Sequence, residues 1–157
     1  PATMIVGGLF DAEDLYGPFN TYKSIEKNSD NYNTVVFGPW SHGDWARTSE
    51  RQVVGNIYFG DEISDGFQKN VETKFFNHFL KDEANGETGL PEASMFNTGT
   101  KQWESFASWP PENTAKESYF MQPSERLTKQ ANRILATSDF LSDPKKPVPY
   151  TEDIKGY

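Results

Sequence analysis

Hydrophobic positions in the first forty residues follow two different periods. Residues 4–6, which precede two glycines, and residues 32–37 form short apolar runs rich in β-branched and aromatic residues, as in buried strands. Between them, residues 14–27 carry apolar side chains at spacings of three and four, with acids at the start and lysines toward the end: Leu15, Phe19, Tyr22 and Ile25. This pattern predicts a helix despite Gly17 and Pro18 near its start.

A strand, a helix and a second strand of these lengths predict a βαβ unit with parallel strands. Asp11 and His42 each follow one of these strands, in Gly7-Gly8-Leu9-Phe10-Asp11 and Gly38-Pro39-Trp40-Ser41-His42-Gly43. They should therefore emerge at the same edge of the sheet, where open parallel sheets place their chemistry. A carboxylate there can orient an imidazole whose other nitrogen takes the proton of a nucleophile. We interpret the pair as two members of a catalytic triad.

The third member, the nucleophile, has no candidate in the expected place. In α/β-hydrolases the nucleophile precedes the acid and the histidine along the chain, but no serine or cysteine precedes Asp11. The segments around Ser41 and Ser64 each have only one glycine of the G-x-S-x-G motif, and both serines follow the acid. We therefore expect the chain to be a fragment whose nucleophile lies upstream.

The rest of the chain changes character after a second helix. Residues 67–80 carry an apolar stripe with Phe76 and Leu80 beside it, which predicts a long helix packed on a core: Phe67, Val71, Phe75 and Phe79. The polar stretch 81–91 has two glycines and a proline and is typical of a connector. Short apolar runs at 93–96, 103–106, 117–121 and 132–135 then predict the first strands of a β-sandwich. They are too few to close one, so we expect truncation at this end as well.

Composition and charge restrict the function further. The chain has 157 residues, 35% of them hydrophobic, which is enough for a packed core. A net charge of -8 argues against nucleic acid or an anionic membrane as partner, and tolerates a cationic small substrate. The absence of cysteine excludes disulfides and thiolate metal sites. It leaves the compartment open, with a periplasmic or secreted bacterial location favoured over the cytoplasm.

Six segments, in order along the chain, resemble one family of serine hydrolases: Gly8 to Gly17, Gly38 to Gly43, Phe75 to Lys81, Thr98 to Trp103, Ser108 to Pro111 and Ser142 to Tyr150. The family contains X-prolyl dipeptidyl peptidases, bacterial cocaine esterase, α-amino acid ester hydrolases and glutaryl cephalosporin acylases. The resemblance implies that residues 1–84 are the C-terminal portion of an α/β-hydrolase catalytic domain. Residues 85–157 would be the N-terminal portion of a jelly-roll β-sandwich domain, and the serine and the oxyanion tyrosine would lie upstream.

By this resemblance Asp11 is the triad acid and His42 the triad base. In α-amino acid ester hydrolases the acid is followed by an x-Glu-Asp pattern that contributes carboxylates to hold the substrate's α-ammonium group, and Asp11-Ala12-Glu13-Asp14 fits it. Glu13 and Asp14 are therefore expected substrate ligands. Neighbouring carboxylates also leave a negative potential that an ammonium group can neutralise.

The sequence also allows structural interpretations of these residues. Asp11, Glu13 and Asp14 also suit a helix cap that favours the macrodipole, and His42 could be an ordinary loop histidine. Trp40, expected to bind substrate by shaping an acyl pocket, could instead only pack.

For the function, we expect a serine hydrolase that cleaves α-amino acid esters or β-lactam acyl side chains through an acyl-enzyme. An X-prolyl dipeptidyl peptidase, a cocaine esterase-like acylesterase and a non-catalytic binding module on a degenerate hydrolase scaffold are the alternatives. No cofactor and no metal ligand are expected, the isolated fragment should be inactive, and a homo-oligomer is left open for the full-length protein.

Overall fold

The computed structural model describes residues 1–47, 50–81, 86–123, 125–131, 137 and 139–148. The chain divides into two compact units, Pro1–Glu112 and Asn113–Tyr157.

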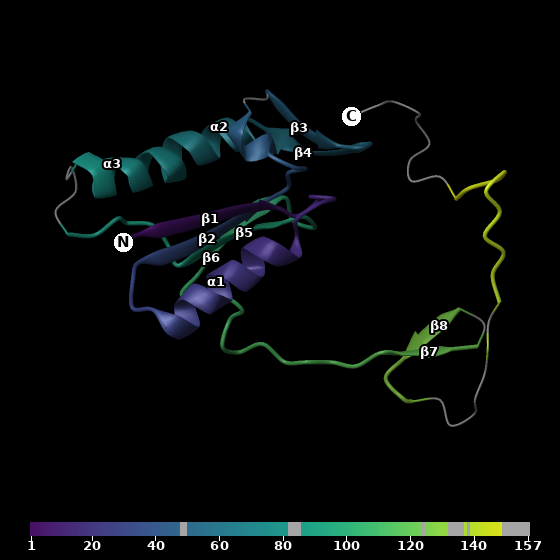
Figure 1. The fold of residues 1–157 in the computed structure, drawn as a ribbon. Coiled ribbons are helices and arrows are strands. Elements are labelled where there is room, and N and C mark those ends of the chain that lie inside the picture. The colour runs from purple at the N-terminus through teal and green to yellow at the C-terminus, as the bar shows by residue number, and fades with distance from the viewer. Residues whose placement is uncertain (48–49, 82–85, 124, 132–136, 138, 149–157) are drawn as a thin grey trace. The chain divides into compact units, whose positions relative to one another are not determined.

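The first unit is built on a four-stranded mixed sheet (Figure 1). Strands β1 (Thr3–Gly8) and β2 (Asn33–Gly38) are parallel neighbours, β5 (Ala93–Asn97) lies parallel to β2, and β6 (Gln102–Phe106) pairs with β5 in the antiparallel sense. Helix α1 (Tyr16–Asn28) connects β1 to β2. The predicted βαβ unit and its parallel strands are thus confirmed.

The start of α1 lies slightly later than its apolar pattern indicates. Asp14 Oδ1 accepts the backbone N–H of Gly17 at 3.1 Å, so the residues before Tyr16 form a turn that leads into the helix. Pro18 lies in the first turn, where the missing N–H has no partner to lose. The helix therefore tolerates both Gly17 and Pro18, which are unfavourable in a helix interior.

The prediction that the runs at 93–96 and 103–106 begin a sandwich is wrong. They form β5 and β6 of the first sheet, and the compact unit continues to Glu112, past the predicted boundary between residues 84 and 85. Residues Ala93 to Phe96 are all buried, because both faces of the sheet are covered here. A strand buried on both faces has a continuous run of apolar residues instead of an alternation of apolar and polar ones. Such a short run does not indicate which sheet the strand joins.

Two hydrophobic clusters cover the two faces of the sheet. On one face, Phe19 and Tyr22 of α1 pack on Val35 and Phe37, with the Phe19 and Phe37 rings stacked at 3.8 Å. The other cluster includes Val36 of β2 together with Trp40, Phe59, Ile63, Phe67 and Phe96. Alternate residues of β2 thus face opposite layers, as the pleat of a strand requires.

The second layer contains a hairpin that the sequence pattern did not predict. Strands β3 (Arg51–Val54) and β4 (Ile57–Asp61) are antiparallel and lead into α2 (Ile63–Phe67), the π-helical turn η2 (Gln68–Glu72) and α3 (Thr73–Lys81). The expected single helix over 67–80 is therefore helical throughout but contains a wide turn. In this turn the Thr73 hydroxyl donates to the Gln68 carbonyl at 2.7 Å.

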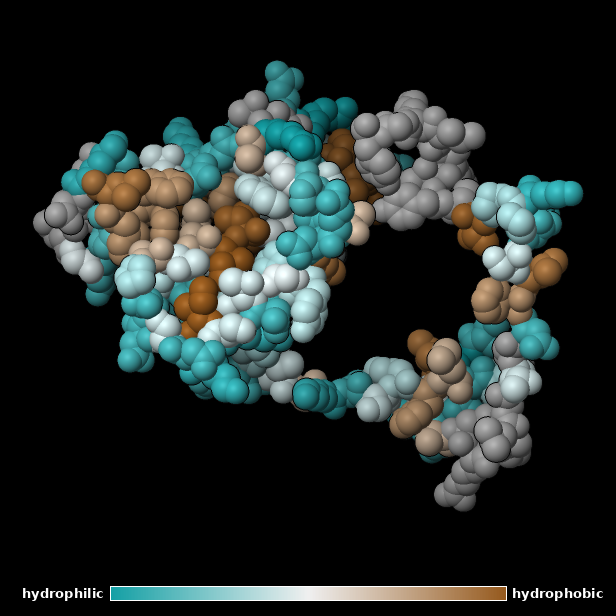
Figure 2. Space-filling model, in the orientation of Figure 1, coloured by the Kyte–Doolittle hydropathy of each residue, from teal (hydrophilic) through white to brown (hydrophobic). Residues whose placement is uncertain are grey.

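Helix α3 buries only part of its apolar surface. Phe75 is buried, whereas Phe76 and Leu80 are exposed, and hydrophobic side chains are visible on the surface over α3 (Figure 2). None of the helices in the described part of the chain is both long and apolar enough to cross a lipid bilayer.

The second unit shows one antiparallel hairpin, formed by β7 (Phe120–Gln122) and β8 (Arg126–Thr128). Strand β7 overlaps the apolar run predicted at 117–121. The run predicted at 132–135 lies outside the described residues, so the jelly-roll assignment of this region stays a prediction.

Candidate active site

The candidate site forms where β1 and β2 end. Beyond the strands, the backbone N–H of Leu9 donates to the Gly38 carbonyl at 2.9 Å, and that of Phe10 donates to the Trp40 carbonyl at 3.0 Å. Gly8 permits this approach, because a Cβ at that position would overlap the Trp40 carbonyl. The segments that carry Asp11 and His42 are thereby held side by side.

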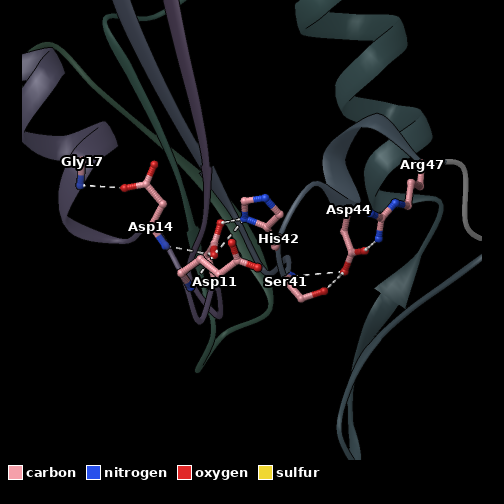
Figure 3. Close-up of polar contacts among 8 residues, drawn as sticks. Asp11, Asp14, Gly17, Ser41, His42, Asp44 and Arg47 are labelled. Atoms are coloured by element: carbon pink, nitrogen blue, oxygen red, sulfur yellow. Dashed lines mark hydrogen bonds and ion pairs between the residues drawn. The ribbon is translucent and has the colours of Figure 1, made fainter. Parts of the chain in front are cut away.

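The His42 imidazole contacts the Asp11 carboxylate through a single ring nitrogen (Figure 3). Nδ1 lies 3.0 Å from Asp11 Oδ2 and 3.2 Å from Oδ1. A carboxylate only accepts, so Nδ1 must carry the proton and Nε2 of the neutral ring keeps its lone pair. The side chain of Asp11 is 3% exposed and that of His42 is 56% exposed. The acid is therefore enclosed while the base faces outward.

Asp11 also stabilises the turn that precedes α1. Its Oδ1 accepts the backbone N–H groups of Glu13 at 2.9 Å and of Asp14 at 3.1 Å. The capping interpretation and the triad interpretation are therefore compatible, because one carboxylate fulfils both geometries. The amide bonds fix the rotation of the carboxyl group, and this in turn fixes the direction from which the imidazole can approach it.

The surroundings shift the pKa values of the two groups apart. Burial disfavours the Asp11 carboxylate, but the N–H groups of Glu13 and Asp14 and the His42 ring outweigh it, so the pKa of Asp11 lies below its usual value. The pKa of His42 is raised by its hydrogen bond to Asp11, by the charge of Asp11 and by that of Glu13, and Arg47 opposes the rise. This is the arrangement of a carboxylate that stabilises an imidazolium.

The loop after His42 closes on itself. The backbone N–H and the hydroxyl of Ser41 both donate to Asp44 Oδ2, at 3.1 and 2.5 Å, and Arg47 pairs with Asp44 Oδ1 at 3.4 Å (Figure 3). Gly43 has φ of +75°, and it precedes the 3-10 turn η1 (Asp44–Ala46). His42 thus lies between two residues that are tied to each other.

The other predicted site residues divide into surface and core. Glu13 and Asp14 are exposed. Asp14 Oδ1 accepts the Gly17 N–H, whereas the structure shows no hydrogen bond from a described residue to the Glu13 carboxylate. Trp40 is 0% exposed and its indole Nε1 donates to Ser64 Oγ at 2.9 Å. The structure therefore places Trp40 in the core, as the packing alternative supposed, and away from the surface of the site.

Neither Ser41 nor Ser64, the serines of the two partial G-x-S-x-G segments, hydrogen-bonds the imidazole in the described structure. The Ser41 hydroxyl donates to Asp44, and Ser64 is buried against Trp40 and Gln52. Within the described residues, Asp11 is the group that hydrogen-bonds the imidazole. Nε2 therefore has no hydrogen-bond partner among the residues that the structure describes.

A cavity of about 500 Å³ lies elsewhere in the first unit. Its walls are mostly apolar and come from β4, α2, η2, β5 and β6, including Phe59, Ile63, Val71, Phe96 and Trp103. Neither Asp11 nor His42 lines it. The cavity is therefore separate from the Asp11–His42 pair, which remains the candidate active site because it joins a buried carboxylate to an exposed imidazole.

Two solved structures resemble this chain over nearly its whole length. An aminopeptidase from the marine sediment archaeon Thaumarchaeota archaeon aligns with a TM-score of 0.80 and 32% sequence identity, over 96% of this chain and 24% of its own. An α-amino acid ester hydrolase aligns with a TM-score of 0.76 and 28% identity, over 94% of this chain and 25% of its own. No model of a known protein family and no curated protein matches the sequence. The chain thus spans about a quarter of the length of the two hydrolases that it resembles.

Proposed function

We propose that this chain carries the acid and the base of a serine hydrolase triad, and that the nucleophilic serine belongs to a part of the protein outside it. The observation that carries the proposal is the pair formed by buried Asp11 and exposed His42 at the ends of two adjacent parallel strands. The likeness to an aminopeptidase and to an α-amino acid ester hydrolase supports hydrolysis as the reaction class. The six sequence segments that resemble the X-prolyl dipeptidyl peptidase and cocaine esterase family support membership of that family.

The geometry gives each residue a step in acyl transfer. His42 Nε2 takes the proton of the serine hydroxyl as its oxygen attacks the ester or amide carbonyl, and then delivers that proton to the leaving alcohol or amine. Water repeats the cycle on the acyl-enzyme and restores the serine. Asp11 stays ionised throughout because its pKa is lowered, and it stabilises the imidazolium that forms twice in each cycle.

The proposed substrate class is an ester or amide with a free α-amino group, such as an α-amino acid ester or a β-lactam acyl side chain. The exposed carboxylate of Glu13 supports it, because its charge already acts on the neighbouring imidazole and no described residue hydrogen-bonds it. Asp14 would contribute a second carboxylate from the same turn. Both similar structures are named for amino-acid substrates, the one an aminopeptidase and the other an α-amino acid ester hydrolase.

The test uses the full-length protein and an activated α-amino ester. We expect hydrolysis and the labelling of one serine by a fluorophosphonate, seen as an adduct by mass spectrometry, and the loss of both in His42→Ala. His78→Gln is the matched control, because His78 lies on α3 against Phe79 and away from the pair. Hydrolysis that survives His42→Ala would contradict the proposal, and a full-length protein without activity would favour the binding-module alternative. The purified 157-residue chain should show no hydrolysis.

A further inference from the structure

The segment around His42 is attached to the second layer at two points. Before the histidine, the Trp40 indole Nε1 donates to Ser64 Oγ of α2 at 2.9 Å. After it, Gln68 Nε2 of η2 donates to the Trp45 carbonyl at 2.8 Å. The two tryptophans also contact each other, with ring centroids 6.3 Å apart. The helical segment formed by α2 and η2 therefore holds both sides of the loop that presents the base.

The first attachment is part of a buried polar chain. Trp40, Ser64 and Gln52 are all nearly inaccessible to solvent, and Ser64 Oγ lies 3.4 Å from Gln52 Oε1 of β3. A hydroxyl can accept from the indole and donate to the glutamine amide at the same time. In a dry interior each group depends on the next, because an unpaired buried donor is costly. Loss of the hydroxyl would leave the Trp40 N–H without a partner.

Trp40 connects this chain of hydrogen bonds to the acid as well as to the base. Its carbonyl accepts the backbone N–H of Phe10, the residue before Asp11, and its own position is two residues before His42. Its ring is fixed by Phe67 at 5.2 Å in an edge contact and by Trp103 at 5.6 Å. A movement of Trp40 would therefore displace the two segments of the pair relative to each other.

We propose that Ser64 and Gln68 are positioning residues: through Trp40 and Trp45 they fix the His42 loop so that the imidazole stays aligned with Asp11. This inference rests on the proposed hydrolase function. Neither side chain touches the reacting groups, so their effect is on geometry. The expected effect is therefore on proton transfer by the acid–base pair and not on the binding of substrate. A displacement of about 1 Å in a catalytic group can cost about 100-fold in rate.

The experiment compares Ser64→Ala and Gln68→Met in the full-length protein with an activated α-amino ester. For Ser64→Ala we expect kcat to fall about 10- to 100-fold while KM stays within about twofold. The weaker contact with Asp11 should also lower the His42 pKa, which moves the acidic limb of the kcat/KM profile to lower pH. Gln68→Met should shift the same limb by less. The half-buried position of Gln68 keeps this variant informative if Ser64→Ala does not fold.

Matched controls separate positioning from general stability. Ser94→Ala removes another buried serine hydroxyl, on β5, and Gln102→Met changes an exposed glutamine on β6. Both should leave the pH profile in place. If Ser64→Ala and Gln68→Met lower the melting temperature but leave kcat and the acidic limb unchanged, the positioning role is wrong and the contacts only stabilise the fold. If His42→Ala retains activity, the proposed function itself fails. The His42 ring titration, followed by NMR, would then still show whether the two variants disturb the pair.

Discussion

The substitution Asp11→Asn tests the proposed pair with the smallest change in shape. In the structure, Asp11 Oδ1 accepts the two N–H groups of Glu13 and Asp14, and Oδ2 lies 3.0 Å from His42 Nδ1. Asparagine has only one carbonyl oxygen, and the two backbone donors require it at the Oδ1 position. The amide NH₂ must then face His42 Nδ1. Because an NH₂ group donates, it selects the tautomer that carries its proton on Nε2.

Because Asp11→Asn favours the wrong tautomer of His42, we expect a large loss of activity with little change in structure. An imidazole protonated on Nε2 cannot take the proton of the nucleophile. In the Asp11→Asn variant the His42 ring also has no carboxylate to stabilise its charged form. The same substitution in the serine protease triad lowers kcat about 10⁴-fold, which corresponds to about 5 kcal/mol in activation free energy. The turn before α1 should persist, because the side chain still accepts both backbone N–H groups.

Two assays test this prediction, one for the loss of activity and one for the tautomer of His42. The kcat of the full-length protein on an activated α-amino ester should fall about 10⁴-fold, and the ¹⁵N shifts of the His42 ring should show the proton on Nε2. Asp30→Asn, an exposed position after α1, is the control for the loss of one charge. A loss below about tenfold, in a variant with a native melting temperature, would refute the proposed role of the carboxylate.

Three further predictions concern the same region. Glu13→Gln should reduce kcat/KM for α-amino esters about tenfold or more, because a hydrogen bond to a charged group contributes about 1.5–3 kcal/mol, and should affect acetate esters far less; equal losses on both would reject an ammonium-binding role. Gly8→Ala should destabilise the protein by about 1–3 kcal/mol in denaturant unfolding, because its Cβ meets only backbone atoms of Trp40 and Ser41. Gly66→Ala, whose Cβ meets nothing within 4 Å, should not destabilise it, and similar losses in both would count against the close approach. The raised pKa of His42 stabilises the fold below about pH 6.5 and that effect is lost as the pH rises through the folded pKa. The lowered pKa of Asp11 stabilises it above about pH 4 and that effect is lost on acidification. His42→Gln should therefore lower the melting temperature more at pH 5 than at pH 9, and a pH-independent difference would contradict the pairing.

The sequence pattern was sufficient to predict β1, α1 and β2 because these elements pack against one another within the first forty residues. The apolar stripe of α1 needs a surface to cover, and the strands on either side of it provide one. The parallel direction follows from the connection alone, so the proximity of Asp11 and His42 could be predicted from the sequence. No comparable local rule assigns β5 to a sheet. Its place in the sheet comes from β2 on one edge and β6 on the other, and an apolar run does not indicate which strands it will pair with.

Trp40 shows that a recognisable sequence motif does not fix the role of every residue in it. Its place beside the histidine in the sequence suggested a wall of the substrate pocket, because neighbours of a catalytic residue often face the same cleft. The partners that decide its direction are Ser64 and Phe67, which belong to α2, a helix distant in sequence from the loop. The indole is fully buried, so its N–H needs an acceptor in the core, which the Ser64 hydroxyl supplies. A residue two positions before the base can therefore affect the chemistry from the core, and its effect on the rate would then depend on the buried Ser64 hydroxyl that holds it.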